Sequence, residues 1–350
     1  MNVKILLYLI FIMPFLFIQC ASQPPEFSET EWLHKVEGVD SALLYAPHQN
    51  TDGSFFNPWL QRSHNRGSWF SREKKKYDEF PVEKYNAVVN DYSYLSDNSF
   101  DSITFSGHAS MIIKMDGQTI FTDPFFSNSA LIVRKKIKIK FDFSKVPHRP
   151  VVLISHNHYD HLDKSSVKQL AKKEAVFIVP LGLKKIIADY GANAVYELDW
   201  WQSVTVDSVE YTLLPIQHWS RRVRQKGGMS LWGSFMIQGS RTIYFSGDTG
   251  YFIGFKEFGN RWNIDYALLG AGAYEPRWFM HYAHMNVEEF LRAAEDLKAR
   301  YAIPMHFGVL SLSDEPLLYP LFEIDRAIDL RPELAQTIRP LRVGEFLRIE

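Results

Sequence analysis

Residues 151–163 read VVLISHNHYDHLD, an apolar run that passes directly into His156, His158, Asp160 and His161. A continuous apolar run bounded by polar residues is typical of a buried β-strand. Packing does not explain four ligand-type side chains at its end, because a buried imidazole or carboxylate costs several kcal/mol unless it is paired or bound to a metal. Chance is a weak explanation, since the pattern His-x-His-x-Asp-His arises by accident in roughly one chain in a thousand. The motif therefore predicts a metal site at the end of a strand.

Three further ligand-type residues also follow apolar runs. They are His218 after YTLLPIQ, Asp248 within IYFSGDTG, and His306 within YAIPMHFG. A single His after a strand is more often a hydrogen-bonded rim residue, but the first motif changes that interpretation. Together the seven residues are five His and two Asp, a set that suits zinc and leaves iron or manganese open. We expect each strand to deliver one ligand to a common point at one edge of a sheet.

The start of the chain predicts an export signal at residues 1–20. Lys4 precedes an apolar run at residues 5–18, which is shorter than the roughly 20 residues that span a bilayer. Cys20 resembles the acylated cysteine of bacterial lipoproteins, while cleavage near Ala21 and an uncleaved anchor are the alternatives. As the only cysteine, it excludes internal disulfides and thiolate ligands in the mature domain. We expect an exported protein associated with a membrane of the cell envelope.

The rest of the chain divides into a linker with an N-terminal arm at 21–100 and a main domain at 101–350. Asp116-Gly117 predicts a turn between two strands, and Asn286 with Glu289 predicts a helix start. We expect helices at 165–173, 181–191, 286–301 and 320–330, and a last strand within 339–350. Strands grouped with helices in two successive halves predict helices layered over sheets.

Charge and composition limit the partners. The net charge of −1 gives no global positive field for a polyanion, so we expect no nucleic acid partner. Aromatic residues make up 15% of the chain, which suits either core packing or contact with lipid. The run RKKIKIK at 134–140 suits an anionic membrane surface or an edge strand protected by Lys. The run RRVRQK at 221–226 predicts a solvated loop, with phosphate contact as the alternative.

The ordered motifs SHNHYDHLD, His218, GDTGY and His306 resemble those of the metallo-β-lactamase superfamily, whose α+β fold is a four-layered αββα sandwich. That resemblance implies His156, His158 and His218 on one metal, Asp160, His161 and His306 on a second, and Asp248 bridging both. Other strings, among them FFNPW, LWGSF, GAYEPRWFM and IPMHFG, are similar to the phospholipase D branch that hydrolyses N-acylphosphatidylethanolamine. The similarity extends from about Gly53 to Glu350.

The resemblance to this branch implies a zinc-dependent phosphodiesterase with two Zn²⁺ ions and a phospholipid substrate, which is cleaved to N-acylethanolamine and phosphatidic acid. Two cations about 3.5–4 Å apart suit this reaction, since they activate water and neutralise charge on phosphoryl oxygens. Asp160 and Asp248 would be catalytic, and Tyr159 and His284 would approach the head group. Ala283 departs from the branch, where an amide stands, so head-group contacts would differ.

Two residues outside the ligand set have alternative interpretations. Asp123 in FTDPFF would orient a ligand His through its ring N–H, or else form an Asx turn before Pro124. His108 in SGHAS would face the site, or else be a satisfied buried His.

The substrate and the assembly are less constrained than the site. The same fold and metals would also serve a lactone or another phosphodiester, because fold does not determine function. A metal-binding lipoprotein without activity predicts an incomplete ligand set, whereas all seven residues are present. A homodimer is left open.

Overall fold

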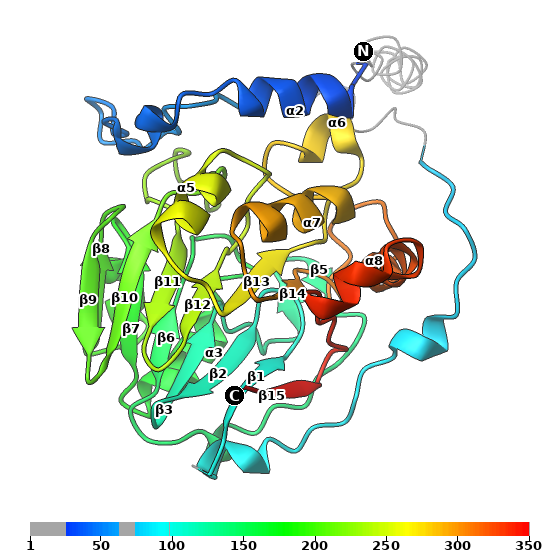
Figure 1. Ribbon diagram of the computed structural model, residues 1–350. Helices are drawn as coiled ribbons and strands as arrows, with labels where there is room; N and C mark the ends of the chain where they lie inside the picture. Colours follow the sequence, from blue (N-terminus) through cyan, green and yellow to red (C-terminus); the bar gives the residue numbers. More distant parts are fainter. Residues whose placement is uncertain (1–25, 63–73, 98, 350) are drawn as a thin grey trace, which may run out of the picture.

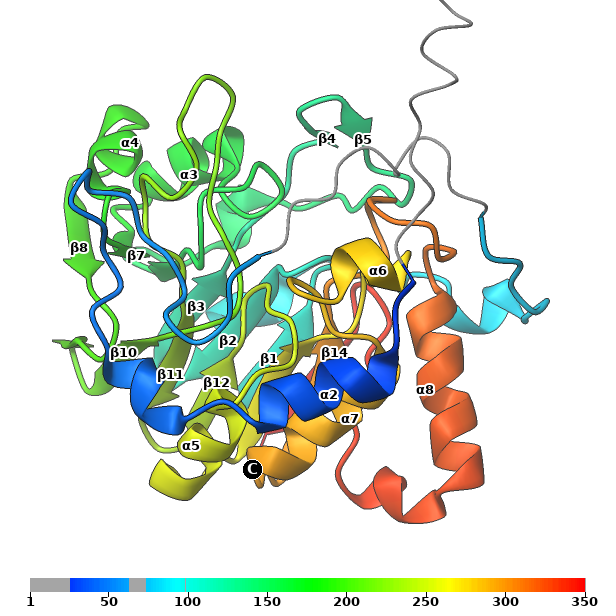
Figure 2. The ribbon, with the colours of Figure 1, turned by 90° about the horizontal axis from the view of Figure 1, so that it is seen from above.

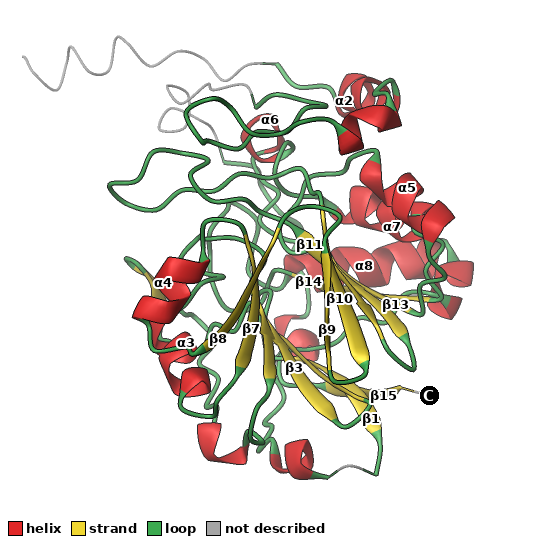
Figure 3. Cartoon of the chain, turned by 90° about the vertical axis from the view of Figure 1, so that its left-hand side faces the viewer, coloured by secondary structure: helices red, strands yellow, loops and turns green. Residues whose placement is uncertain are grey.

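The computed structural model describes residues 26–62, 74–97 and 99–349. Two β-sheets pack face to face, with helices on the outer face of each, as Figure 1 and Figure 3 show. This is the αββα sandwich expected from the sequence. The predicted export signal at 1–20 lies outside the described residues. Within them, no helix combines the length and the apolar character needed to cross a bilayer.

The first sheet has the strand order β15-β1-β2-β3-β6-β7-β8. Its bounds are β1 Asp101–Phe105, β2 Met111–Met115, β3 Gln118–Thr122, β6 Val151–Leu153, β7 Val176–Pro180, β8 Ala194–Leu198 and β15 Phe346–Ile349. Strands β3, β6, β7 and β8 are parallel, while β1, β2 and β15 complete the sheet by antiparallel pairing. The predicted turn at Asp116-Gly117 joins β2 to β3, and both of its residues have positive φ.

The second sheet has the order β14-β13-β12-β11-β10-β9. Its bounds are β9 Ser203–Val206, β10 Val209–Leu214, β11 Ser234–Gln238, β12 Thr242–Phe245, β13 Tyr266–Gly270 and β14 Tyr301–Met305. Strands β12, β13 and β14 are parallel, and β10 runs in the same direction because both β10 and β12 are antiparallel to β11. A separate short hairpin consists of β4 Ser129–Ala130 and β5 Val133–Arg134.

The helices cover the two outer faces. The α-helices are α2 Glu29–Glu37, α3 Lys164–Ala171, α4 Lys184–Asp189, α5 Gly254–Arg261, α6 Arg277–Met280, α7 Val287–Asp296 and α8 Tyr319–Leu330. The 3₁₀ turns are η1 Ser41–Tyr45, η3 Val82–Tyr85, η4 Ser93–Ser96, η5 Phe143–Lys145 and η6 Pro332–Gln336. Figure 3 shows α3 and α4 beside the first sheet and α5, α7 and α8 beside the second.

Alternating side chains explain why these strands form continuous apolar runs. In β2, Met111 and Ile113 face the core between the sheets, whereas Ile112 faces the core beneath α3 and α4. In β7, Ile178 faces the core between the sheets and Phe177 faces the core beneath α3 and α4. Successive side chains of a strand point to opposite faces, so a sheet covered on both faces needs apolar residues at every position.

Several element boundaries differ from those predicted. The helix expected at 286–301 begins as predicted, with a capping box between Asn286 and Glu289, but ends at Asp296 because Tyr301 already belongs to β14. The last strand covers only Phe346–Ile349 of the predicted 339–350. Within RKKIKIK only Arg134 belongs to a strand, so the edge-strand interpretation is wrong for the rest of that run.

The N-terminal arm packs on the second half of the sandwich. The sequence shows no sustained period here, yet Glu29–Glu37 forms α2, which begins with Ser28 accepting a hydrogen bond from the Glu31 amide. Trp32 and Val36 of this helix are buried in the main core. Figure 2 shows α2 lying beside α7. The helix depends on this packing, because isolated helices of nine residues are marginal in water.

Candidate metal centre

Loops at the carboxyl ends of strands from both sheets bring the predicted ligands together. The loop after β6 carries His156–His161, and the loops after β10, β12 and β14 carry His218, Asp248 and His306. These four strands end at the same edge of the sandwich, where the two sheets meet. The sequence predicts one sheet edge, but the site lies across the ends of two sheets.

One group of donors consists of three imidazoles. His158 Nδ1 lies 2.8 Å from His156 Nε2 and 3.3 Å from His218 Nε2. Burial lowers the pKa of His158 to about 4 and those of His156 and His218 well below 6.5, so all three rings are neutral. Three neutral imidazoles whose ligand nitrogens all lie within 4.8 Å of one another are a donor set for one metal ion. The group therefore suits a metal ion.

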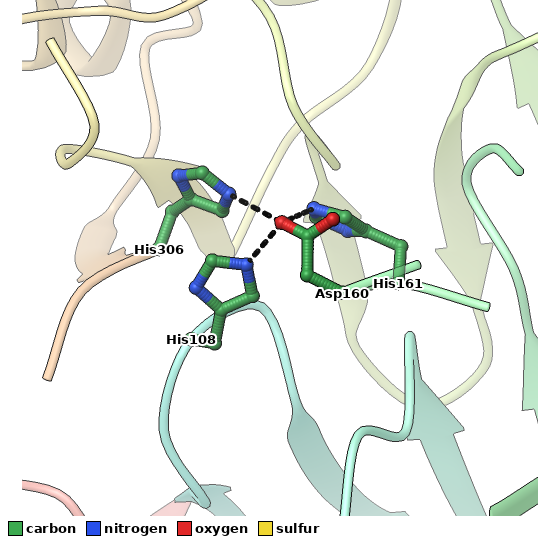
Figure 4. A group of neighbouring side chains, drawn as sticks. All are labelled: His108, Asp160, His161 and His306. Atoms are coloured by element: carbon green, nitrogen blue, oxygen red, sulfur yellow. Dashed lines mark hydrogen bonds and ion pairs between the residues drawn. The ribbon is translucent and has the colours of Figure 1, made fainter. Parts of the chain in front are cut away.

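The second group surrounds Asp160. Its Oδ2 lies 3.4 Å from His161 Nε2, 4.0 Å from His306 Nε2 and 2.7 Å from His108 Nε2, as Figure 4 shows. His108 is thus both buried and aimed at the site. Burial acts to raise the pKa of Asp160, but the charge of His161 and a hydrogen bond from His108 hold it well below its usual range. An ionised carboxylate with neighbouring imidazoles is a donor set for a divalent cation.

Asp248 lies between the two groups. Its Oδ2 lies 3.0 Å from His161 Nε2, 3.9 Å from His218 Nε2 and 4.0 Å from His156 Nε2. Its Oδ1 lies 2.9 Å from His306 Nε2. This carboxylate therefore reaches members of both donor groups, which is the position required of a bridging ligand.

Hydrogen bonds on the far side of three imidazoles aim their Nε2 atoms at the site. His161 Nδ1 donates to Asp123 Oδ2 at 2.7 Å, and Ser155 Oγ donates to the same oxygen at 2.5 Å. Ser155 Oγ in turn accepts from His156 Nδ1 at 2.9 Å, and His306 Nδ1 lies 3.4 Å from the Gly272 carbonyl. Each ring thus points Nε2 toward the site, where that nitrogen can bind a metal once it carries no proton. Asp123 has the predicted orienting position, and its carboxylate binds Ser155 and His161 rather than forming an Asx turn.

The fit of the site to metal ions rests on buried polar atoms. His161 Nε2, His306 Nε2 and Asp248 Oδ1 are buried, and among the described residues their short contacts with one another lack hydrogen-bond geometry. Buried polar atoms are normally paired, and at a cluster of nitrogen and oxygen donors a cation is the natural partner. Asp123 and His306 also have positive φ, at 36° and 72°, a backbone strain that is often found at functional sites.

The site opens into a cavity of about 330 Å³. Metal-centre residues at its floor include His158, Asp160, His218, Asp248 and His306. Apolar walls come from Leu131, Trp219, Phe279, Met280 and Leu312, and Arg62 adds a cation stacked on Trp219 at 4.3 Å. The cavity can therefore receive a molecule that has a polar centre and an apolar body.

The predicted head-group residues line this cavity. Tyr159 and His284 both face it, and His284 Nδ1 lies 4.0 Å from Asp248 Oδ2. Ala283, at the predicted departure from the branch, also lines the cavity. The structure thus places these residues where substrate contact is geometrically available, while their roles stay predictions.

The prediction of a fully solvated loop at 221–226 is wrong for one residue. Arg222 is buried, and its guanidinium lies 3.8 Å from the Tyr159 ring centroid. It donates to the carbonyls of Asn157 at 2.8 Å and Leu162 at 3.3 Å. Arg222 therefore fixes the loop that carries the first four ligands, rather than meeting solvent.

A family model described as a beta-lactamase superfamily domain matches residues 118–307, more than half of the chain. The chain belongs to the metallo-β-lactamase superfamily. Together with the cluster of His and Asp donors, this membership identifies the chain as a metal-dependent hydrolase. The matched segment contains the seven predicted ligands, and the residues outside it supply the arm, β1, β2 and the last strand.

Two curated superfamily relatives are similar to most of this chain. A mitochondrial N-acyl-phosphatidylethanolamine-hydrolyzing phospholipase D from Saccharomyces cerevisiae is 34% identical over 62% of this chain, and the match spans 49% of the yeast protein. The N-acyl-phosphatidylethanolamine-hydrolyzing phospholipase D 1 of Caenorhabditis elegans is 31% identical over 67% of this chain and 71% of its own length. The crystal structure of a "possible metal-dependent hydrolase" from Veillonella parvula superposes with a TM-score of 0.59 at 14% identity, covering 72% of this chain and all of that one. That structural likeness shows the superfamily fold alone.

Sequence reasoning missed the cavity walls and the supports of this superfamily site. Phe279 lies in the quoted string GAYEPRWFM and Trp219 directly follows His218, but only the structure shows that they meet Arg62 around the cavity. Ser155 could have been found, because it directly precedes the first ligand.

Proposed function

We propose that this chain is a phosphodiesterase that hydrolyses N-acylphosphatidylethanolamine-type phospholipids, using two Zn²⁺ ions. Two relatives at 34% and 31% identity carry that activity in their names. The observation that carries the proposal is the cavity, which joins a site for divalent cations to apolar walls and the guanidinium of Arg62. A phosphodiester flanked by acyl chains matches this combination of charge and apolar surface.

The two donor groups described above, three imidazoles and the residues around Asp160, would each hold one ion. His156, His158 and His218 would hold one ion, Asp160, His161 and His306 the other, with Asp248 shared. Bound zinc would supply Lewis-acid activation of water and of the phosphoryl oxygens. Nitrogen and oxygen donors without thiolate suit Zn²⁺ at a catalytic site.

The protein's own groups would bind the lipid and move protons. Arg62 would pair with the phosphoryl oxygens. Asp160, whose side chain is 15% exposed, would accept a proton from water as the water oxygen bonds to phosphorus. The bond from phosphorus to the ethanolamine oxygen then breaks, and the proton passes from Asp160 to that oxygen. One water is consumed, and N-acylethanolamine and phosphatidic acid are released.

The direct test is product analysis. Purified zinc-loaded protein is incubated with N-acylphosphatidylethanolamine, and the lipids are analysed by mass spectrometry with and without a chelator. Phosphatidic acid and N-acylethanolamine should appear in equal amounts, and the chelator should suppress both. Turnover of lactones or soluble diesters alone would show that the substrate assignment is wrong.

Replacing Asp248 with Asn tests the shared carboxylate. Breaking a buried, charge-paired site costs about 3–5 kcal/mol, so we expect turnover to fall by about two to four orders of magnitude. Bound zinc should also fall when it is measured by elemental analysis. Asp189→Asn, an exposed change on α4, is the matched control. Wild-type turnover in Asp248→Asn would remove this residue from the site.

A further inference from the structure

The β4–β5 hairpin exposes apolar side chains at its tip. Leu131 is 49% exposed and Ile132 is 90% exposed, although the tips of short hairpins normally carry polar residues or glycine. Leu131 has a φ of 52°, an unfavourable backbone conformation for a leucine whose side chain stays half exposed. Folding of the isolated chain does not account for this pair of residues.

The hairpin is anchored at the rim of the metal centre. Ala130 and Leu131 line the same cavity as the metal-centre residues. At the hairpin base, the buried Lys135 donates from Nζ to the Phe125 carbonyl at 2.6 Å, and the Lys136 amide donates to the Val309 carbonyl at 2.8 Å. Figure 2 shows the hairpin and α6 on the same side of the molecule. The exposed tip is therefore held in place beside the cavity.

A row of cations follows the tip. Arg134, Lys136, Lys138 and Lys140 are exposed, while the residues between them are buried or half-buried. Within the described part of the chain, none of these four cations makes an ion pair. Alternation thus gathers unpaired positive charge on the outward side of the segment, although the whole chain has a net charge of −1.

We propose that the β4–β5 hairpin docks the protein on an anionic lipid bilayer, with Leu131 and Ile132 inserted among the acyl chains and the four cations on the head groups. Apolar residues flanked by basic ones are the combination that binds anionic membrane surfaces. Two exposed apolar residues are too small a patch for a stable protein interface, which buries about 800 Å² per partner. The proposal rests on the proposed function, because docking here would bring lipid to the mouth of the cavity.

Vesicle binding tests the docking without requiring activity. Zinc-loaded protein is co-sedimented with vesicles of phosphatidylcholine alone or with one quarter phosphatidylglycerol. Wild type should bind the anionic vesicles at least tenfold more tightly, and added salt should weaken that binding. Ile132→Asp should weaken it at least tenfold, whereas Val89→Asp, a change at another apolar residue that is 98% exposed, should not.

A charge-matched pair tests the cations. Lys136→Glu/Lys138→Glu should weaken binding to anionic vesicles at least tenfold, whereas Lys184→Glu/Lys185→Glu on α4 should leave it within twofold. Equal binding of wild type to both kinds of vesicle, or wild-type affinity in Ile132→Asp, would overturn the proposal. A change in the sedimentation of the protein alone on Ile132→Asp would also overturn it, because the tip would then contact a second copy.

Activity separates docking from chemistry. Ile132 does not line the cavity, so Ile132→Asp should lower hydrolysis of phospholipid in anionic vesicles at least tenfold and leave hydrolysis of soluble bis(p-nitrophenyl) phosphate unchanged. An equal loss on both substrates would refute docking as the role of Ile132. If the protein hydrolyses neither substrate, the proposed function fails, while the vesicle-binding result still decides the role of the hairpin.

Discussion

Replacing Asp123 with Asn should weaken metal binding without unfolding the protein. The Asp123 side chain is fully buried and accepts from His161 Nδ1 at 2.7 Å, from Ser155 Oγ at 2.5 Å and from the Ser155 amide at 2.7 Å. An Asn side chain keeps one oxygen for these three donors and puts an NH₂ group against the others. With its oxygen toward His161 the Asn side chain holds that ring through a neutral acceptor instead of a carboxylate, and with its NH₂ group there it does not hold the ring at all.

The size of the effect follows from the lost hydrogen bond. A hydrogen bond to a charged group contributes about 1.5–3 kcal/mol, which corresponds to roughly 10- to 150-fold in affinity. Loss of a group that orients a metal ligand typically costs 10- to 100-fold in metal affinity or activity. Both estimates predict a loss of one to two orders of magnitude.

The assay is zinc competition with a chromophoric chelator, with circular dichroism to confirm the fold. Ser155→Ala is the comparison variant, because it removes one donor to Asp123 and the neutral acceptor of His156 Nδ1, and leaves the charged contact between His161 and Asp123 in place. We expect a smaller loss for Ser155→Ala than for Asp123→Asn. Zinc affinity within twofold of wild type in folded Asp123→Asn would refute the reasoning.

Two further predictions concern stability and packing. Burial, with Glu29 nearby, raises the pKa of Glu289 from 4.5 to about 7 despite its pairing with Arg277. Between pH 4.5 and 7 the folded state therefore keeps a proton that the unfolded state releases, so the free energy of unfolding falls as pH rises, by at most about 3 kcal/mol. In urea unfolding, Glu289→Gln should make the free energy of unfolding less dependent on pH in this range, whereas the exposed Glu288→Gln should not. The same pH dependence in Glu289→Gln and wild type would contradict the assignment. Gly272→Ala would put a Cβ 2.2 Å from the His306 carbonyl oxygen. We therefore expect the free energy of unfolding, measured by thermal unfolding, to fall by about 1–3 kcal/mol and zinc binding to weaken. An unchanged zinc affinity would show that the backbone moves to relieve this contact without disturbing His306.

Local signals in the sequence predicted most of the regular elements. Asp116-Gly117 accommodates positive φ, so the turn between β2 and β3 could be recognised without any tertiary information. The capping box of α7 is equally local, since Asn286 and Glu289 satisfy each other's backbone amides. The end of α7 was less accessible, because the parallel pairing of β14 with β13 decides where the helix must stop.

Elements stabilised by distant contacts were not predictable. Helix α2 has a weak local pattern and depends on burial of Trp32 and Val36 against the sandwich. Arg222 belongs to a basic run that predicts a solvent-exposed side chain. It is buried because Tyr159, in the loop that carries the first four ligands, packs against its guanidinium. In both cases the stabilising partner lies in another part of the chain.

The sequence alone singled out seven side chains as predicted metal ligands and predicted that each follows a strand, because residue type and spacing carry the ligand chemistry and the apolar runs. Only the tertiary structure decided that strand ends from two sheets share the site, that Asp248 reaches both donor groups, and that Arg62 and Leu131 border one cavity. The physical reason is that strand order and the packing of one sheet on the other set distances between residues far apart in the chain, and no local pattern encodes those distances.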